Sequence, residues 1–186
     1  MDNLFPLQNS SLVNILTLRY DPSLKPNLPR KTSNDFEINN IVPDTEFIEK
    51  TICDNIEQNL DKFPERKISI ALSGGVDSTL ALSLTRKVRP DIEIEAISIK
   101  FADSVDETIA ASKIAQKFNA NHSILYLENY LSELPKAISM IKLPFWDLHW
   151  YYVAKKSKML SNILISGDGG DELFSGYTFR YEKFLS

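Results

Sequence analysis

The sequence predicts an α/β protein with a doubly wound parallel sheet and helices on both faces. From Asp44 onward, short apolar runs rich in β-branched residues alternate with longer amphipathic segments, the pattern of βαβ units. The composition is that of a globular domain, with 43% hydrophobic and 25% charged residues over a length of 186. Glycine-rich turns follow two of the expected strands, where parallel sheets present ligand-binding loops.

The first expected helix begins at Asp44 or Thr45, either of which can cap its first amides. Its apolar residues recur every four positions and form one buried stripe: Ile48, Ile52, Ile56 and Leu60. Pro64 ends this helix, because proline cannot donate the hydrogen bond that would continue it.

The remaining elements follow from the same alternation of patterns. Apolar, β-branched runs predict strands over 67–72, 91–99, 122–127 and 162–165. Amphipathic periodicity predicts helices over 77–88, 106–118, 131–141 and 148–160, the third of them stopping near Pro144. This second region, 44–186, is one domain.

Residues 1–43 have a different character and are predicted to form an extended arm. Prolines, which fix φ and remove a backbone donor, recur through it: Pro6, Pro22, Pro26, Pro29 and Pro43.

Charge and composition exclude several classes of protein. No window approaches the roughly 18 apolar residues of a membrane span. The net charge of −4 and the lack of a dense basic block argue against a nucleic-acid surface. Cys53 is the only cysteine, which fits a reducing cytoplasm, and Met1 is not followed by the basic and apolar runs of a secretory signal.

The first glycine-rich turn, residues 73–78, has the properties of a phosphate-binding loop. It lies between a strand and a helix, whose first amides and partial positive charge bind anions. Gly74 and Gly75 let the backbone curl around the anion, and Ser73 and Ser78 add hydroxyl donors. Asp77 is repelled by a polyphosphate unless a cation lies between them, so we assign it to Mg²⁺. The alternative is an ordinary strand-to-helix turn with a capping serine.

This segment resembles the SGGxDS signature of the N-type ATP pyrophosphatases. The superfamily includes asparagine, GMP, NAD and argininosuccinate synthetases and several tRNA-modifying enzymes. The resemblance implies an adenine nucleotide α-hydrolase-like fold with strand order 3-2-1-4, cleavage of ATP between its α and β phosphates, and adenylation of a substrate oxygen.

The second turn, residues 166–177, closely resembles the SGEGxDELFxGY segment of asparagine synthetases and their β-lactam synthetase relatives. It follows the fourth expected strand, so both turns are expected to face one cleft at the carboxyl edge of the sheet. An acidic, solvated loop is the alternative. The resemblance spans roughly residues 45–181 and implies that the domain over 44–186 is an ATP pyrophosphatase domain of the asparagine-synthetase type.

The resemblance also implies roles for individual residues. Asp77 and Asp171 are expected to flank Mg²⁺, and Asp168 and Asp171 are the expected catalytic residues. The residues expected to bind ATP are Leu72, Ser73, Gly74, Gly75, Asp77, Ser78, Ile99, Ser166 and Gly167, with Ile99 lining the adenine pocket.

The sequence departs from the family pattern at several places. Asp168 replaces the usual glutamate and Lys100 the usual glycine after the second strand. Asp2 stands where the glutaminase domain of the family has its nucleophilic cysteine. Family members continue well beyond the second turn, and a lysine of that later part is thought to stabilise the adenylation transition state; no residue here is given that role.

The expected activity is adenylation of aspartate by ATP-Mg²⁺ followed by amidation with ammonia, which gives asparagine, AMP and pyrophosphate. Ammonia is expected from solution or from a separate glutaminase, and a polypeptide carrying the later half of the family domain is a second expected partner. One alternative is an incomplete nucleotide-binding module without independent catalysis. Another is tRNA thiolation, which is disfavoured because sulfur transfer uses reactive cysteines.

Several conspicuous side chains are expected to be structural. His122 and His149 lack the Cys or Asp neighbours of a metal site. The aromatic run around Trp150 is expected to pack in the core, with the wall of an acceptor pocket as the alternative. Glu107 is expected on the solvated face of its helix.

Overall fold

The computed structural model describes residues 10, 13–14, 44–102, 104–129, 131–141, 148–174 and 176. The arm over 1–43 therefore lies, apart from three residues, outside the described part, as do 142–147 and most of the chain beyond 174. Within the described part, no helix combines the length and the apolar character needed to cross a bilayer.

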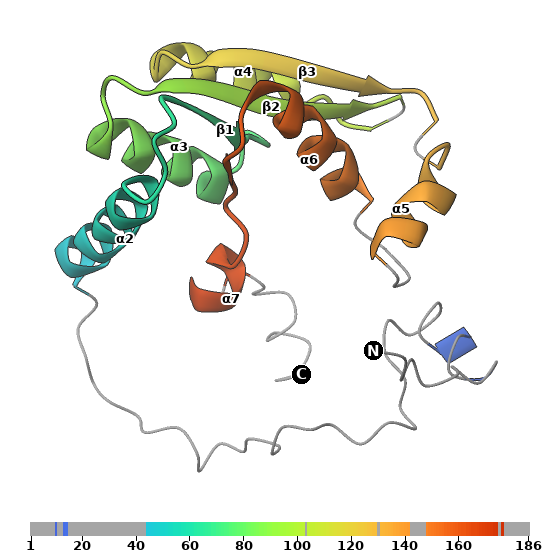
Figure 1. Cartoon of the computed structure of the whole chain (residues 1–186), viewed down its shortest axis with the longest axis horizontal. Coiled ribbons are helices and arrows are strands. Elements are labelled where there is room, and N and C mark those ends of the chain that lie inside the picture. Colours follow the sequence, from blue (N-terminus) through green and yellow to red (C-terminus); the bar gives the residue numbers. More distant parts are fainter. Residues whose placement is uncertain are drawn as a thin grey trace.

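The α/β prediction is confirmed (Figure 1). The elements are α2 (Thr45–Leu60), β1 (Lys67–Ala71), α3 (Val76–Val88), β2 (Glu93–Phe101), α4 (Thr108–Lys117), β3 (Asn121–Leu127), α5 (Leu134–Ile141), α6 (His149–Leu160), β4 (Leu164–Ile165) and α7 (Gly170–Phe174). The strands form one sheet in the order β3-β2-β1-β4, and every pairing is parallel. This is the order that the family resemblance implies.

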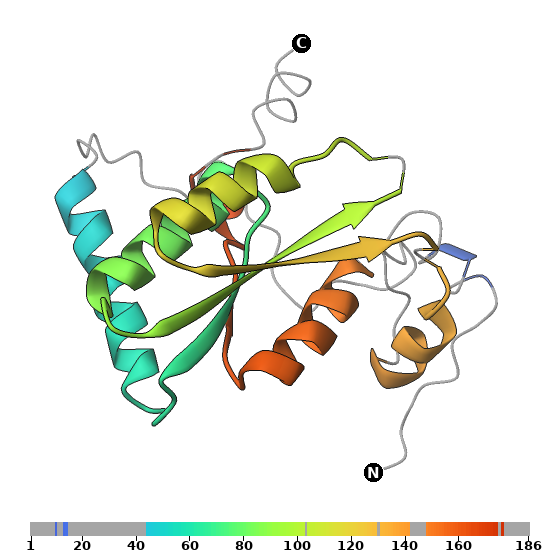
Figure 2. The same cartoon turned by 90° about the horizontal axis from the view of Figure 1, so that it is seen from above.

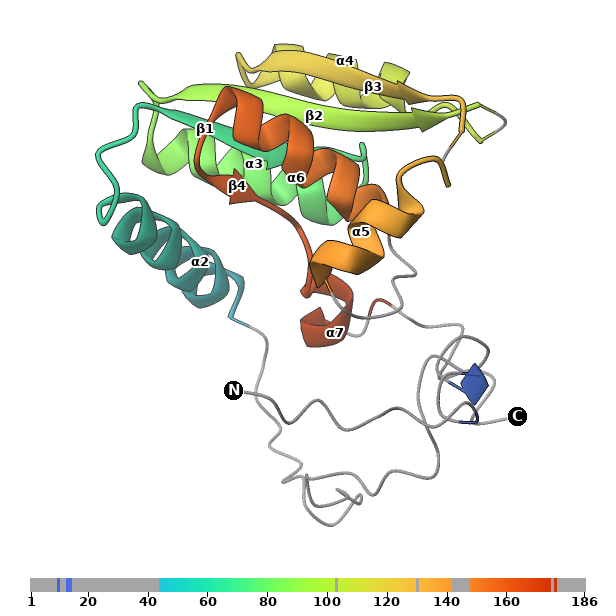
Figure 3. The same ribbon diagram turned by 45° about the vertical axis from the view of Figure 1, so that its right-hand side comes forward.

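Helices cover both faces of the sheet. Helices α3 and α4 lie on one face and α6 lies on the other, while α2 packs against α3 (Figures 2 and 3). Since each helix returns the chain to the start of the next parallel strand, α3, α4 and α6 all begin at the carboxyl edge of the sheet. The carboxyl edge is therefore where helix N-termini gather.

The pleat of β1 decides what each face of the sheet contacts. Ile68, Ile70 and Leu72 are fully or almost fully buried and belong to the cluster that α3 and α4 cover. On the other face β1 presents Ser69, whose hydroxyl lies 2.8 Å from that of Ser161 at the end of α6. Large side chains thus fill the α3–α4 side, and a small polar residue lies on the α6 side.

The boundaries differ from the sequence prediction in ways that pairing and turns explain. Strand β2 runs on to Phe101 because its last residue pairs with Leu127 of β3. Helix α5 begins at Leu134 rather than 131, because a turn in which the amide of Leu134 bonds to the carbonyl of Leu131 precedes it. The predicted strand over 162–165 is shorter, and the glycine turn after it contains the short helix α7.

Arg86 stabilises the edge of the sheet at which the strands begin, opposite the glycine turns. The Arg86 guanidinium on α3 donates to four backbone carbonyl oxygens, at 2.8–2.9 Å: those of Pro90, Ile92, Phe118 and Asn119. These carbonyls belong to the chain entering β2 and to the end of α4. Arg86 therefore fixes where β2 begins and where α4 ends.

We expect Arg86→Ala to lower the free energy of unfolding by about 2–4 kcal/mol, since it leaves carbonyls without a charged donor. Arg89→Ala is the control at the same end of α3, because Arg89 pairs with the exposed Asp61 and should cost at most about 1 kcal/mol. Urea denaturation followed by circular dichroism measures both. If both variants lose the same free energy of unfolding, the hydrogen bonds of Arg86 to the four carbonyls do not stabilise the fold more than a surface ion pair does.

Candidate functional site

The first glycine turn leads from β1 into α3 through a compact set of hydrogen bonds. The Ser78 hydroxyl, almost completely buried, accepts from the Ser73 amide at 3.2 Å and lies 3.0 Å from the Ser73 hydroxyl. The Ser73 hydroxyl in turn accepts from the Gly75 amide at 3.2 Å. Gly74 has a φ of 88°, a left-handed conformation that favours glycine. The loop is therefore held by its own serines and is shaped before any ligand binds.

The N-terminus of α3 differs from that of α2 in how it is capped. Helix α2 begins at Asp44, whose side chain accepts from the Phe47 amide at 3.0 Å. Helix α3 begins at Gly75, which has no side chain to cap the first turn. The first amides of α3 are therefore left to a ligand or water, and a helix N-terminus attracts anions.

The second glycine turn packs directly onto the first. A Cβ on Gly167 would lie 2.8 Å from both the carbonyl carbon of Asp77 and the amide nitrogen of Ser78, so only glycine fits. A Cβ on Gly170 would lie 2.6–2.9 Å from the carboxylate group of Asp77. Gly169 between them has a φ of 93°. The two turns, about 90 residues apart in sequence, therefore form one continuous wall.

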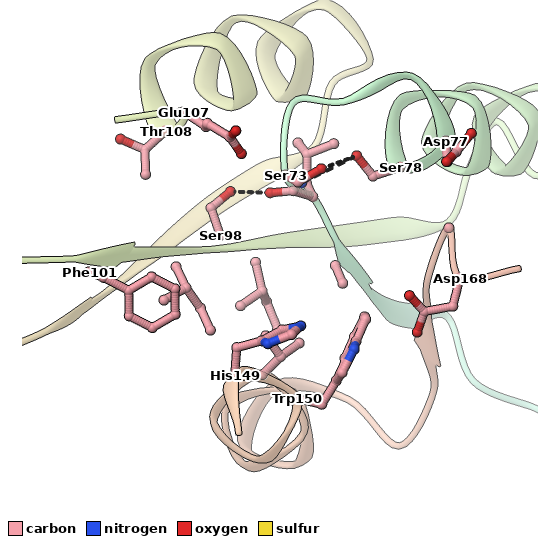
Figure 4. A pocket seen from close by; sticks show the side chains of 16 residues that line it. Ser73, Asp77, Ser78, Ser98, Phe101, Glu107, Thr108, His149, Trp150 and Asp168 are labelled. Atoms are coloured by element: carbon pink, nitrogen blue, oxygen red, sulfur yellow. Dashed lines mark hydrogen bonds between the residues drawn. The ribbon is translucent and has the colours of Figure 1, made fainter. Parts of the chain in front are cut away.

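Between the turns, the sheet and α6 lies a cavity of about 410 Å³ (Figure 4). Its apolar floor comes from the ends of β1 and β2 and from α6, with Leu72, Ile97, Ile99, Phe101 and Val153. Its polar wall comes from the two turns and from the start of α4, with Ser73, Asp77, Ser78, Glu107, Thr108 and Asp168. An apolar slot beside hydroxyl groups and an uncapped helix N-terminus suits a nucleotide.

A second, acidic cavity of about 500 Å³ adjoins the first. It is lined by the carboxylates of Asp77, Asp168, Asp171 and Glu172, by the backbone of the second turn and by Trp150. Carboxylate oxygens beside a phosphate site are the donors that Mg²⁺ prefers. In the described residues no three acidic, histidine or cysteine side chains are placed to hold a metal ion by themselves, so this donor set fits a magnesium ion only where phosphate oxygens complete its ligands.

Hydrogen bonds also fix the start of α4 where it meets the first cavity. Both the hydroxyl and the amide of Thr108 donate to Asp106, at 2.5 Å and 3.0 Å. These two bonds hold the pKa of the Asp106 carboxyl below its usual value, and the bond from the Thr108 hydroxyl contributes more than the bond from its amide. Thr108 is thereby fixed in the cavity wall.

The structure brings most of the sequence-predicted residues to these two cavities. Those lining at least one of them are Leu72, Ser73, Asp77, Ser78, Ile99, Gly167, Asp168 and Asp171. Gly74, Gly75 and Ser166 belong to the turns but do not line the first cavity. Lys100 bonds to the carbonyls of Phe101, Ala102 and Ser104, so its ammonium group fastens the loop after β2.

One structural expectation was wrong in part. Among the described residues of the aromatic run expected in the core, Tyr152 is buried there and Tyr151 packs against it. His149 and Trp150 instead line the first cavity. Glu107 is exposed, as expected, and also lines this cavity. The signal that could have found these residues is position: each lies at or next to the start of a helix at the carboxyl edge of the sheet.

This fold and site define a class of protein: an adenine nucleotide α-hydrolase-like domain with a glycine-rich turn after its first strand. Solved structures with the same fold include the NH3-dependent NAD synthetase of Campylobacter jejuni, with a TM-score of 0.53, 19% identity, and coverage of 73% of this chain and 62% of that one. A glutamine-dependent NAD+ synthetase of Acinetobacter baumannii in complex with ADP has a TM-score of 0.55 at 15% identity, over 76% of this chain and 29% of that one.

The particular family is given by sequence. The family model described as asparagine synthase matches residues 63–186, so the chain belongs to the asparagine synthase family. It is 30% identical over 115 residues to asparagine synthetase [glutamine-hydrolyzing] 1 of Bacillus subtilis, covering 60% of this chain and 18% of that protein. It is 32% identical over 111 residues to a putative asparagine synthetase [glutamine-hydrolyzing] 2 of Methanocaldococcus jannaschii, covering 57% and 22%. The matches span about a fifth of these relatives.

We expect Gly167→Ala to weaken ATP binding at least tenfold, because the new methyl group meets the backbone of α3 and must push the two turns apart. Isothermal titration with ATP-Mg²⁺ measures this. Ser83→Ala, which removes only a bond to the Leu80 carbonyl within α3, is the control and should bind ATP as the natural protein does. Unchanged affinity in Gly167→Ala would contradict the packing of the turns.

Trp150 lines both cavities, so its emission should report on ligand binding. The sequence has two tryptophans, Trp146 and Trp150. We expect ATP-Mg²⁺ to change the fluorescence of the protein, and this change to disappear in Trp150→Phe but persist in Trp146→Phe. A change that persists in Trp150→Phe would place the ligand away from α6.

Proposed function

We propose that this chain binds ATP and transfers its adenylyl group to the side-chain carboxylate of aspartate, with release of pyrophosphate, and that ammonia then displaces AMP to give asparagine. The observation that supports this most strongly is the contact of Gly167 with the first turn of α3. That contact gives one cavity two phosphate-facing turns, both with the motifs of the asparagine synthase family.

The cavity suggests how ATP is held. Adenine is placed in the apolar slot beside Leu72 and Ile99, where a flat apolar ring can be buried. The phosphates then lie against the loop of Ser73 to Ser78 and the uncapped amides of α3, where hydroxyls and N–H groups donate to anionic oxygens. Gly167 lines the cavity from the other turn and is placed to contact the nucleotide there, whereas the contact expected of the neighbouring Ser166 stays a prediction.

Asp77 and Asp171 are the residues that would hold Mg²⁺, since both line the acidic cavity next to the phosphate loop. When bound, the ion offsets the charge of the phosphates and of these two carboxylates. Without that cation the acidic cavity would repel ATP.

In the first step, an aspartate carboxylate oxygen forms a bond to the α-phosphorus of ATP. The bond from this phosphorus to the oxygen that bridges to the β-phosphorus breaks, and pyrophosphate leaves with the electron pair. The chain's own contribution is orientation of the α-phosphorus and stabilisation of charge by the loop amides and hydroxyls.

In the second step, ammonia forms a bond to the acyl carbon and the bond to the AMP oxygen breaks. The attacking nitrogen must lose a proton, and we propose Asp168 as the acceptor, because its carboxylate lines both cavities. The relatives named above are glutamine-hydrolyzing, so we further propose that a separate glutaminase or a partner polypeptide supplies ammonia to this chain in the cytoplasm.

The direct test is incubation of the protein with ATP-Mg²⁺, aspartate and ammonium, with assays for pyrophosphate, AMP and asparagine. We expect the three products in equal amounts. ATP binding without pyrophosphate release would favour the alternative, a nucleotide-binding module that needs a partner for catalysis. Absence of ATP binding would refute both.

Substitution of Asp168 separates the two steps. We expect Asp168→Asn to lower the rate of amidation about 100-fold while ATP affinity stays within a factor of about two, because the amide cannot accept the proton. Asp168→Glu restores the family's residue and should keep most of the activity. Quenched-flow measurement of pyrophosphate and asparagine distinguishes the steps, and equal loss of both products would contradict the assignment.

A further inference from the structure

A chain of hydrogen bonds runs from α4 through the sheet to the phosphate loop. The Ser112 hydroxyl on α4 lies 2.8 Å from Nδ1 of His122, and Nε2 of His122 lies 2.8 Å from the hydroxyl of Ser98 on β2. The Ser98 hydroxyl donates to the carbonyl oxygen of Leu72 at 2.5 Å (Figure 4). Leu72 is the last residue before the first glycine turn, and both Leu72 and Ser98 line the first cavity, where the nucleotide is proposed to bind.

The donor and the acceptor of each hydrogen bond in this series follow from the carbonyl acceptor at its end. A backbone carbonyl can only accept, so the single hydroxyl proton of Ser98 points at Leu72. Ser98 must then accept from His122, which requires a proton on Nε2 of the imidazole. In the neutral ring Nδ1 consequently accepts from Ser112. Burial lowers the pKa of His122 and so favours this neutral ring.

At its end, this chain of hydrogen bonds orients one rigid unit, the peptide group between Leu72 and Ser73. The carbonyl of Leu72 and the amide of Ser73 belong to the same planar peptide group. The carbonyl side is held by Ser98, and the amide side donates to the Ser78 hydroxyl of α3 at 3.2 Å. Two bonds at opposite sides thus fix the plane of the peptide from which the loop departs.

We propose that His122 is a positioning residue for the phosphate loop: through Ser98 it orients the peptide between Leu72 and Ser73 and so shapes the nucleotide site. His122 itself does not line the first cavity. The inference rests on the proposed function only in taking ATP as the ligand.

Three variants test the chain. His122→Leu removes the donor to Ser98, His122→Gln keeps an N–H that can reach Ser98, and Ser98→Ala removes the link. We expect His122→Leu and Ser98→Ala to weaken ATP binding about tenfold, which corresponds to about 1.4 kcal/mol, and His122→Gln to stay within about threefold of the natural protein. The double variant of Ser98→Ala and His122→Leu should be no weaker than either single variant, because both break the same link.

Ser112→Ala is the matched control, since it removes a bond of the same length from the other nitrogen of the same ring. We expect it to reduce thermal stability much as Ser98→Ala does, yet to leave ATP affinity within about threefold. If Ser112→Ala and Ser98→Ala weaken ATP binding equally, His122 acts through general stability and the proposal is wrong.

Two readouts need no nucleotide. Nitrogen-15 NMR of the His122 ring should report a neutral tautomer protonated at Nε2; a proton on Nδ1 alone would overturn the proposal. Hydrogen exchange of the Ser73 amide should be faster in His122→Leu than in His122→Gln, and equal rates would also overturn it. If the natural protein binds no ATP while these two readouts hold, the proposed function fails and the positioning role stands.

Discussion

The site depends above all on the approach of Gly167 to the backbone of Asp77 and Ser78. That approach joins two turns from opposite ends of the described domain, and it tolerates no side chain. The sheet order allows it, because β4 pairs with β1 and delivers its turn beside the first one. Everything chemical at the site, from the apolar slot to the acidic cavity, lies around this junction of two backbones.

The charge distribution follows from the same junction. Bringing the turns together places Asp77 of α3 in one cavity with Asp168 and Asp171 of the second turn. In the proposed function, a dication held together with the phosphates of ATP offsets these negative charges. The hydroxyls of Ser73 and Ser78 meanwhile satisfy one another, so the loop is kept open without a ligand. The hydrogen bonds of the protein itself therefore set the conformation of the first turn, while a bound cation would neutralise the acidic cavity.

The sequence was sufficient for the parts of the structure that local pattern determines. Among the described residues from Asp44 onward, periodicity located every helix and strand except α7, and the two motifs located the glycine turns that form part of the cavity walls. It was insufficient where long-range packing decides: β2 extends to Phe101 only because β3 pairs with it, and α7 forms inside a segment that reads as a glycine turn. Trp150 was misplaced for a related reason, since an aromatic residue at a helix start suits a core and a cavity wall equally well.

The brevity of β4 has a consequence for the energetics of ligand binding. Strand β4 is only Leu164–Ile165, so the second turn is joined to the sheet through two residue pairs, Ser69 with Leu164 and Ile70 with Ile165. Segments held by few backbone hydrogen bonds open locally at a lower cost in free energy than long strands do. A ligand that contacts both turns would favour the state in which they lie together, and any open fraction would lower its measured affinity. Residues that lengthen or clamp this strand would thus tune affinity from outside the cavity, and natural variation there would alter binding without touching the ligand.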